Sequence, residues 1–214
     1  MRISTGVTAL ALGLTLATGG CSSDKSMAPV MATESGAQKQ FHDAMRVLWV
    51  DHIIWTRLFI VSAAENLPDL APTTQRLLQN QTDIGNAIKP FYGDAAGGQL
   101  TGLLRNHILV AADLVAAAKG GNQSAASEAS LHWYANADSI AAFLNTANPD
   151  NWKLDEMKTM MRQHLDLTLD EAVNHLHADY AAEITAFDRI RDEILQMADM
   201  LSDGIIMQFP NELP

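Results

Sequence analysis

Three histidines that recur at similar intervals are the residues of this chain best suited to chemistry. His52, His107 and His164 lie on apolar stripes, 55 (107 − 52) and 57 (164 − 107) residues apart. Neutral imidazole and carboxylate oxygen are common ligands of zinc, iron and manganese. Four aspartates lie beside these apolar stripes or beside the next apolar stripe along the chain: Asp51, Asp83, Asp138 and Asp199. One interpretation is therefore a site in which these histidines and aspartates hold a divalent metal ion or a small ligand.

A structural role explains the same histidines. An imidazole on an apolar stripe is expected to be buried, and a buried imidazole needs hydrogen-bond partners. Each histidine would then bond to a carboxylate or amide across its own helical hairpin. Asp51 is expected to turn inward with the neighbouring row of Val47, Ile54 and Leu58. This alternative predicts a non-catalytic structural or protein-interaction module.

A second polar group lies further along the chain. Glu171 and His175 are four residues apart, which places them on one face of a helix. His177 and Asp179 follow near the expected helix end, so these four residues are either a secondary metal or ligand cluster or a solvated helix end. Arg57 is expected to form an ion pair with an aspartate of another helix if it faces inward.

The sequence contains no recognisable catalytic motif. It has no P-loop, no Gly-x-Gly-x-x-Gly, no Gly-x-Ser-x-Gly and no His-Glu-x-x-His. It also lacks the Glu-x-x-His pairs of di-metal helical bundles. No catalytic residue is predicted, and a binding or structural role is favoured over an enzyme.

The elements that must position these residues are all helical. Apolar residues spaced three and four apart predict helices over about 40–66, 77–93, 100–119, 123–145, from 154 onward and from 179 to about 205. Gly120 and Gly121 are expected to end the third helix, and Asp179 to cap the sixth. The capping-box spacing of Thr168 and Glu171 predicts a kink or restart within the fifth. The fold class is therefore all-α, a bundle of about six helices.

These six helices are expected to form three copies of one α-hairpin. Asp83, Asp138 and Asp199 mark the second helix of each copy, at steps of 55 (138 − 83) and 61 (199 − 138) residues. The longer second step is attributed to extra residues over 175–180. Both a closed bundle with pseudo-threefold symmetry and a linear stack remain compatible with this repeat.

The N-terminal segment resembles a bacterial lipoprotein signal. Arg2 precedes an apolar run over 7–17, and small residues lead to Cys21, the only cysteine. We therefore predict a signal peptide over 1–20, a lipid-anchored flexible tether over 21–38 and a single helical domain over 39–214. The acyl chains on Cys21, palmitate among them, would hold the domain at a membrane of the cell envelope, facing the periplasm or the exterior. The alternative is an ordinary secretory signal cleaved near Ala17 or Gly20.

The formal net charge of −11 argues against nucleic acid as a partner, because phosphates require a basic surface. The same charge argues against direct contact of the domain with an anionic bilayer. The expected partners are the membrane through the lipid, together with a small ligand or another envelope protein.

Several long strings of the chain are similar to those of an uncharacterised bacterial family of small helical envelope proteins. They are LWVDHIIWTR at 48–57, LQNQTDIGNAIKPFYG at 78–93, HLDLT at 164–168 and MADMLSDGII at 197–206. The resemblance covers about residues 45–210. It implies an all-helical fold and an envelope setting, and it implies no established activity.

Overall fold

The computed structural model describes residues 35–213, and these residues form an all-helical bundle. The predicted signal peptide, Cys21 and most of the predicted tether lie outside the described residues. The helices are α1 (Gly36–Glu65), α2 (Leu70–Ala87), α3 (Lys89–Lys119), α4 (Gln123–Ala147), α5 (Leu154–Leu176) and α6 (Tyr180–Gln208).

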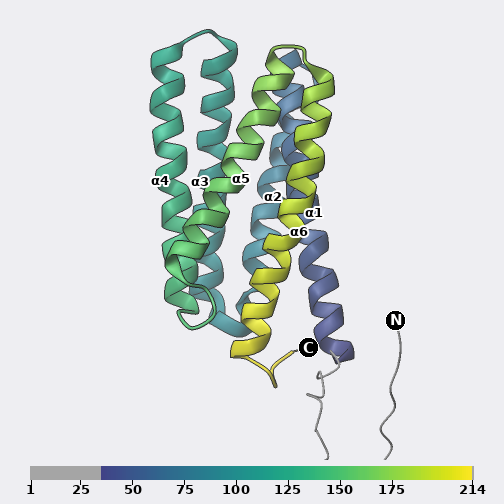
Figure 1. Ribbon diagram of the computed structural model, residues 1–214, viewed down its shortest axis with the longest axis vertical. Helices are drawn as coiled ribbons and strands as arrows, with labels where there is room; N and C mark the ends of the chain where they lie inside the picture. Colours follow the sequence, from purple (N-terminus) through teal and green to yellow (C-terminus); the bar gives the residue numbers. More distant parts are fainter. Residues whose placement is uncertain (1–34, 214) are drawn as a thin grey trace, which may run out of the picture. The chain divides into compact units, whose positions relative to one another are not determined.

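The six helices form a closed ring (Figure 1). Each helix packs against the next one in the chain, and α6 packs against α1, so the repeat gives a closed bundle and not a linear stack. Short connections make consecutive helices antiparallel, which leaves α1, α3 and α5 parallel to one another. In addition, α1 contacts both α3 and α5. The first helices of the three hairpins therefore approach one another inside the ring.

A capping box sets the start of α1. The Ser35 backbone N–H donates to Gln38 Oε1 at 2.8 Å, and the Gln38 N–H donates to Ser35 Oγ at 3.2 Å. These two bonds satisfy N–H groups that have no partner within the helix. The helix consequently begins at Gly36, inside the segment predicted to be tether.

The junction of α2 and α3 differs from the prediction. We expected the second helix to continue to Gly93, whereas α2 ends at Ala87 and residues 89–92 form a separate turn at the start of α3. Pro90 has no N–H to donate, so it cannot continue the hydrogen-bond ladder of α2. Gly93 then adopts φ 81°, where a side chain would be strained, and α3 changes direction there.

The predicted kink in α5 is wrong, because the helix is continuous from Leu154 to Leu176. Thr168 does not cap a new helix; its hydroxyl donates to the backbone carbonyl of His164 at 2.9 Å. Glu171 reaches across to Arg57 and not back to the Thr168 backbone. The predicted end of the third helix and the predicted cap at the start of the sixth are confirmed, since α3 ends at Lys119 before Gly121 with φ 68°, and Asp179 accepts from the Ala182 N–H.

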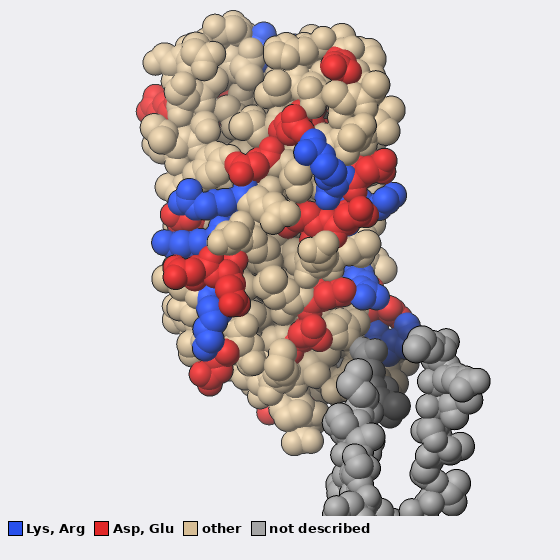
Figure 2. Space-filling view, viewed as in Figure 1, with Lys and Arg blue, Asp and Glu red and all other residues tan. Residues whose placement is uncertain are grey.

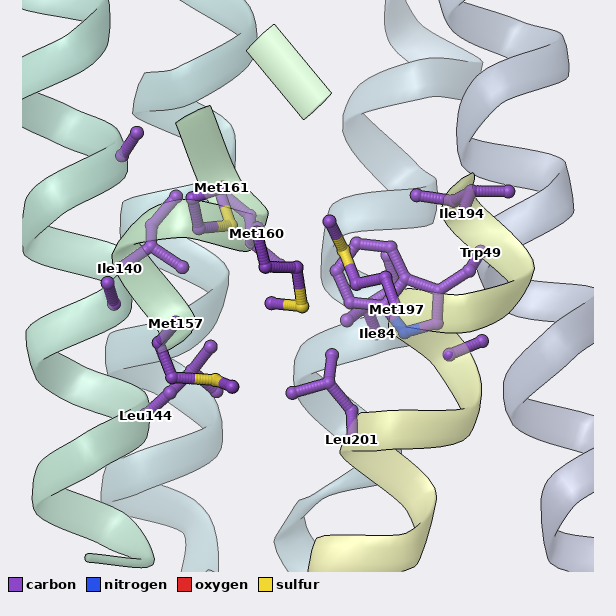
Figure 3. Packing of buried hydrophobic residues seen from close by; sticks show 14 of the residues in the cluster. Trp49, Ile84, Ile140, Leu144, Met157, Met160, Met161, Ile194, Met197 and Leu201 are labelled. Atoms are coloured by element: carbon purple, nitrogen blue, oxygen red, sulfur yellow. The ribbon is translucent and has the colours of Figure 1, made fainter. Parts of the chain in front are cut away.

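Methionine fills much of the core in the half of the bundle that holds the start of α1 (Figure 3). Met157, Met160 and Met161 of α5 face Met197 of α6 across a cluster of aromatic and aliphatic side chains that includes Trp49. Thioether chains suit such irregular spaces. A smaller apolar cluster, with Phe59, Ile108 and Ala172, occupies the other half.

Two of the helices, α1 and α3, are long and apolar enough to cross a membrane by length and composition, with mean hydropathies of 1.4 and 1.3. A core helix of a soluble bundle meets the same criterion. Both helices are ring members that bury residues such as Trp49 and Leu104 in the core.

The close crossing of α2 and α3 yields a stability prediction. A Cβ atom at Gly85 would lie 2.0 Å from Thr101 Oγ1 and 2.6 Å from the Gly97 carbonyl oxygen. We expect Gly85→Ala to lower the free energy of unfolding by about 1–3 kcal/mol, measured by urea denaturation. Gly102→Ala is the control, because Gly102 has open space around it and the added methyl should stabilise α3 by about 0.5–1 kcal/mol. Equal effects of the two substitutions would contradict this account.

Candidate functional site

The three repeated histidines lie at one level inside the ring and line a single cavity. His52 on α1, His107 on α3 and His164 on α5 are 3%, 4% and 4% exposed. The ring centroids of His52 and His164 are 5.6 Å apart. The shared cavity, called here the central cavity, has a volume of about 40 Å³. The histidines thus meet in one space and do not sit in three separate hairpins.

The central cavity extends from the histidines toward the hairpin tips. Its walls come from the turns that follow each histidine: Thr56, Phe59 and Ile60 on α1, Ala111, Leu114 and Ala118 on α3, and Thr168, Ala172 and Leu176 on α5. Thr56 and Thr168 donate their hydroxyls to the carbonyls of His52 and His164, four residues earlier. The walls are therefore mainly apolar, and the histidines form the floor.

Each histidine contacts the residue 29 positions later, on the second helix of its own hairpin. The Nδ1 atoms lie 3.2 Å from Gln81 Nε2, 2.9 Å from Asn136 Oδ1 and 3.0 Å from Glu193 Oε2, for His52, His107 and His164 respectively. The repeat therefore keeps steps of 55 and 57 residues on both helices. The 61-residue step that aligned Asp199 with Asp138 is wrong, because the third partner is Glu193. Searching for a polar residue at one constant distance from each histidine would have found all three partners.

The four predicted aspartates lie outside the central cavity and contact arginines. Asp51 is 3.2 Å from Arg76, and Asp83 is 3.9 Å from the same guanidinium. Two further ion pairs join Asp138 to Arg162 at 2.8 Å and Asp199 to Arg46 at 2.6 Å. None of the four is a second ligand beside the histidines.

The expectation that Asp51 turns inward is wrong. The row it belongs to is exposed, with Val47, Ile54 and Leu58 61%, 41% and 43% accessible to solvent. Successive residues of an α-helix are separated by about 100°. Because His52 points into the ring, Asp51 is turned toward the surface beside α2, where Arg76 pairs with it.

His107 has both ring nitrogens engaged. Its Nδ1–H donates to Asn136 Oδ1, and the Trp133 Nε1–H donates to His107 Nε2 at 3.1 Å. Burial lowers the pKa of His107 to about 3, with proximity to His164 acting in the same direction. This imidazole is neutral and serves as a structural link, as the structural alternative expected.

His52 is neutral in the opposite tautomer. The carbonyl of Leu77 at 2.9 Å and Asn80 Oδ1 at 3.1 Å both accept from Gln81 Nε2, which identifies that atom as the amide nitrogen. The amide therefore donates to His52 Nδ1, and the ring proton is on Nε2. Burial holds the pKa of His52 well below its usual range, and His164 and His107 lower it further.

His164 is the histidine that is paired with a carboxylate. Glu193 Oε2 accepts from the Nδ1–H of His164 at 3.0 Å, so the second ring nitrogen, Nε2, lies outside this pair. Glu193 is 6% exposed, and its second oxygen, Oε1, has no hydrogen-bond partner among residues 35–213. Two imidazoles with different Nδ1 partners therefore line the floor of the cavity: His52, whose Nδ1 faces the Gln81 amide nitrogen, and His164, whose Nδ1 faces a carboxylate.

These donors do not fit the expected divalent metal. Within the described part of the chain, no three His, Cys, Asp or Glu side chains come close enough together to hold a metal ion. His107 Nε2 already accepts from Trp133, and the aspartates are at the surface. The arrangement suits a small uncharged group that can donate one hydrogen bond and accept another.

The secondary cluster is divided by the structure. Glu171 and His175 are buried beside Glu183, and the partly buried Arg57 contacts both glutamates. Arg57 lies 2.7 Å from Glu171 Oε1 and 2.6 Å from Glu183 Oε1, and His175 Nδ1 lies 3.0 Å from Glu183 Oε2. Burial raises the pKa of Glu171 to about 7, although Arg57 opposes that shift.

The remaining members of that cluster lie apart from it. His177 is exposed just beyond α5, and Asp179 caps α6. Arg57 pairs with two glutamates and not with the aspartate that we expected, and it also covers the ring of Phe187 at 4.8 Å. These contacts tie α1 to α5 and α6, so Arg57, Glu171, Glu183 and His175 form a structural network.

A larger depression lies beyond the central cavity, between the tips of the α3–α4 and α5–α6 hairpins. This tip groove has a volume of about 800 Å³. It shares its deeper lining residues with the central cavity, namely Leu114, Ala118, Leu169, Val173 and Leu176. Polar residues such as Lys119, Ser127 and His177 lie at its rim. On the face shown in Figure 2, charged side chains gather over the middle and lower parts, and the end over the hairpin tips is mostly uncharged.

The lowered histidine pKa values predict how stability depends on pH. The pKa of an unfolded histidine is about 6.5. Between pH 6.5 and about 3, the unfolded chain therefore binds a proton that folded His107 does not. The free energy of unfolding should fall on acidification through this range, by about 1.4 kcal/mol per pH unit for each such group. His52 acts in the same direction, whereas Glu171, whose pKa rises from 4.5 to about 7 on folding, opposes the trend between those two values.

The variant His107→Gln isolates this contribution. Urea denaturation at several pH values measures the free energy of unfolding between pH 6 and pH 4. The slope of this free energy against pH should be smaller for His107→Gln than for the wild type, and the two slopes should differ by about 1.4 kcal/mol per pH unit. His132→Gln removes an exposed histidine and should leave the slope unchanged. Parallel curves for wild type and His107→Gln would show that His107 titrates normally in the folded protein.

No family model, no curated protein and no solved structure matches this chain. The resemblance to an uncharacterised helical envelope family stays a prediction that depends on the quoted strings. The geometry of the central cavity and the tip groove is therefore the basis for a functional proposal.

Proposed function

We propose that this protein is a lipid-anchored protein of the bacterial cell envelope whose helical bundle binds a small, uncharged, largely apolar molecule that carries a hydroxyl group. The observation that supports binding is an apolar cavity, floored by histidines, that shares five lining residues with an open groove. Ligand sites in proteins are commonly apolar depressions with a few well-placed polar groups.

The volumes of the tip groove and the central cavity indicate which part of the ligand each would hold. The tip groove, at about 800 Å³, lies within the usual range of about 300–1,000 Å³ for small-molecule sites. The central cavity, at about 40 Å³, has room only for the end of a molecule. In this proposal the body of the ligand occupies the groove and one narrow end passes between Ala118 and Leu176 toward the histidines.

The floor of the cavity supports a hydroxyl as the inserted group. In this proposal a hydroxyl accepts from the Nε2–H of His52 and donates to Nε2 of His164, since the contacts with Gln81 and Glu193 occupy the Nδ1 atoms. The lowered pKa values of His52 and His107 keep those two rings neutral, so neither of them offers a positive charge to a carboxylate. An alcohol should therefore bind better than the acid of the same length.

Binding is tested by adding 1-hexanol or 1-octanol to the protein and measuring the heat of binding by calorimetry and the unfolding temperature by thermal denaturation. Both alcohols should raise the unfolding temperature in a concentration-dependent way, and octanoate should raise it less. Ala118→Phe places a ring at the mouth of the cavity, where the residue is exposed, and should weaken binding at least about tenfold. Ala116→Phe, also exposed on α3 but away from both depressions, is the control.

The absence of any stabilisation by alcohols, or equal binding by the two phenylalanine variants, would exclude this ligand class. A purely structural role for the histidines predicts that result. Metal analysis of the untagged protein belongs to the same experiment, because a bound stoichiometric divalent ion would favour the metal interpretation instead.

The envelope setting is supported by Cys21, which follows the apolar run over 7–17. Because α1 begins at the end of the bundle opposite the hairpin tips (Figure 1), the tip groove lies at the far end of this 30-residue helix from its first residue. A helix of this length spans about 45 Å.

Anchoring is tested by producing the full-length chain in a bacterium with lipoprotein-processing enzymes. The wild type should fractionate with membranes and carry the mass of acyl chains, whereas Cys21→Ser should be released in soluble form. Ser22→Ala is the control and should stay with the membranes. If wild type and Cys21→Ser are equally soluble, the segment is an ordinary secretory signal.

A further inference from the structure

We propose that a groove between α5 and α6, separate from the central cavity and the tip groove, binds an aliphatic diamine or polyamine. This α5–α6 groove has a volume of about 380 Å³. Six of its lining residues are carboxylates or methionines: Asp155, Glu156, Met160, Glu193, Met197 and Met200. The other three lining residues are polar and uncharged.

The feature that singles out this groove is Glu193. Its side chain is more than nine-tenths buried, and its Oε1 atom has no hydrogen-bond partner among residues 35–213. Its other oxygen, Oε2, lies 3.0 Å from His164 Nδ1. A buried carboxylate oxygen without a donor is energetically costly, more so when the group is charged. A ligand that supplies an N–H donor and a positive charge would remove this cost.

The charges around the groove match such a ligand. The groove-lining residues, all in the described part of the chain, include three carboxylates and no lysine, arginine or histidine. Asp155 and Glu156 lie in the first turn of α5, where acidic residues also stabilise the helix N-terminus. Glu193 lies in the middle of α6, so no helix end explains its charge. A ligand with two or more ammonium groups can pair with the acidic rim and with Glu193 together.

The groove walls favour an organic cation over a bare ion. Met160 and Met197 are buried, and Met200, which is 37% exposed, lies nearer the surface. Methionine side chains are flexible and adapt to methylene chains. Thioethers also bind Cu(I), but Met160 and Met197 pack among core side chains (Figure 3) and the groove is far larger than an ion. We therefore assign it to a cation with a chain of several methylenes.

The test is calorimetric titration of the purified full chain with 1,5-diaminopentane and with spermidine, using 1,5-pentanediol as the uncharged control. The amines should bind and the diol should not, and added salt should weaken amine binding. Glu193→Gln should lower the affinity for the amines at least about tenfold, while Glu128→Gln, far along α4, should have no effect.

A second pair of variants keeps the test valid if Glu193→Gln disturbs the fold through His164. Met200→Lys places an ammonium group of the chain itself at the groove and should abolish amine binding. Met207→Lys puts the same charge on an exposed position of α6 outside the groove, and should bind like the wild type. No heat with either amine, unchanged affinity in Met200→Lys, or binding of Cu(I) without binding of amines would each overturn the proposal. These outcomes are independent of alcohol binding in the central cavity.

Discussion

The structure depends on the removal of three imidazoles from water and on the side chains that satisfy them. Each ring is buried at the same level of the bundle and bonds to a residue 29 positions later, on the antiparallel helix of its hairpin. A buried polar group without a partner is costly, so each such contact restricts the register of its two helices. The three partners differ chemically: an amide that donates, an amide that accepts and a carboxylate. His107 and His164 both donate from Nδ1, whereas His52 faces a donor at that atom, so one repeated frame holds two protonation patterns.

Most of the fold follows from the sequence because its signals are local. Apolar spacing of three and four residues identified the six helices, and Gly121 and Asp179 marked two of their ends. The errors arose where two local signals competed. Pro90 ended α2 earlier than the apolar stripe indicated, and the capping-box spacing at Thr168 was overridden because its hydroxyl bonds to the preceding turn. The closure of the ring depends on packing between α1 and α6, which local periodicity does not encode.

The candidate site was predictable only in part. The apolar stripes correctly placed the histidines inside, but the search for partners favoured aspartate, and all four aspartates pair with arginines at the surface. The true partners include Gln81 and Asn136, whose neutral side chains carry no signal in composition or charge. Similarly, Glu171 and His175 were noticed for their spacing, whereas Glu183 and Arg57 joined them through tertiary contacts. Contacts between residues far apart in sequence depend on how the helices pack and how far their long side chains extend. The position of a residue on its own helix face does not determine these contacts.

The location of the histidine partners within hairpins has a consequence for the order in which the chain acquires its structure. Each of these bonds spans only 29 residues, so a hairpin can complete its internal pairing without the other two. The seam between α1 and α6 is different, since the Arg46–Asp199 pair that spans it joins residues 153 apart. Contacts between distant residues form late because closing a long loop costs chain entropy. Assembly of preformed hairpins, completed by closure of that seam, is the route that this topology favours.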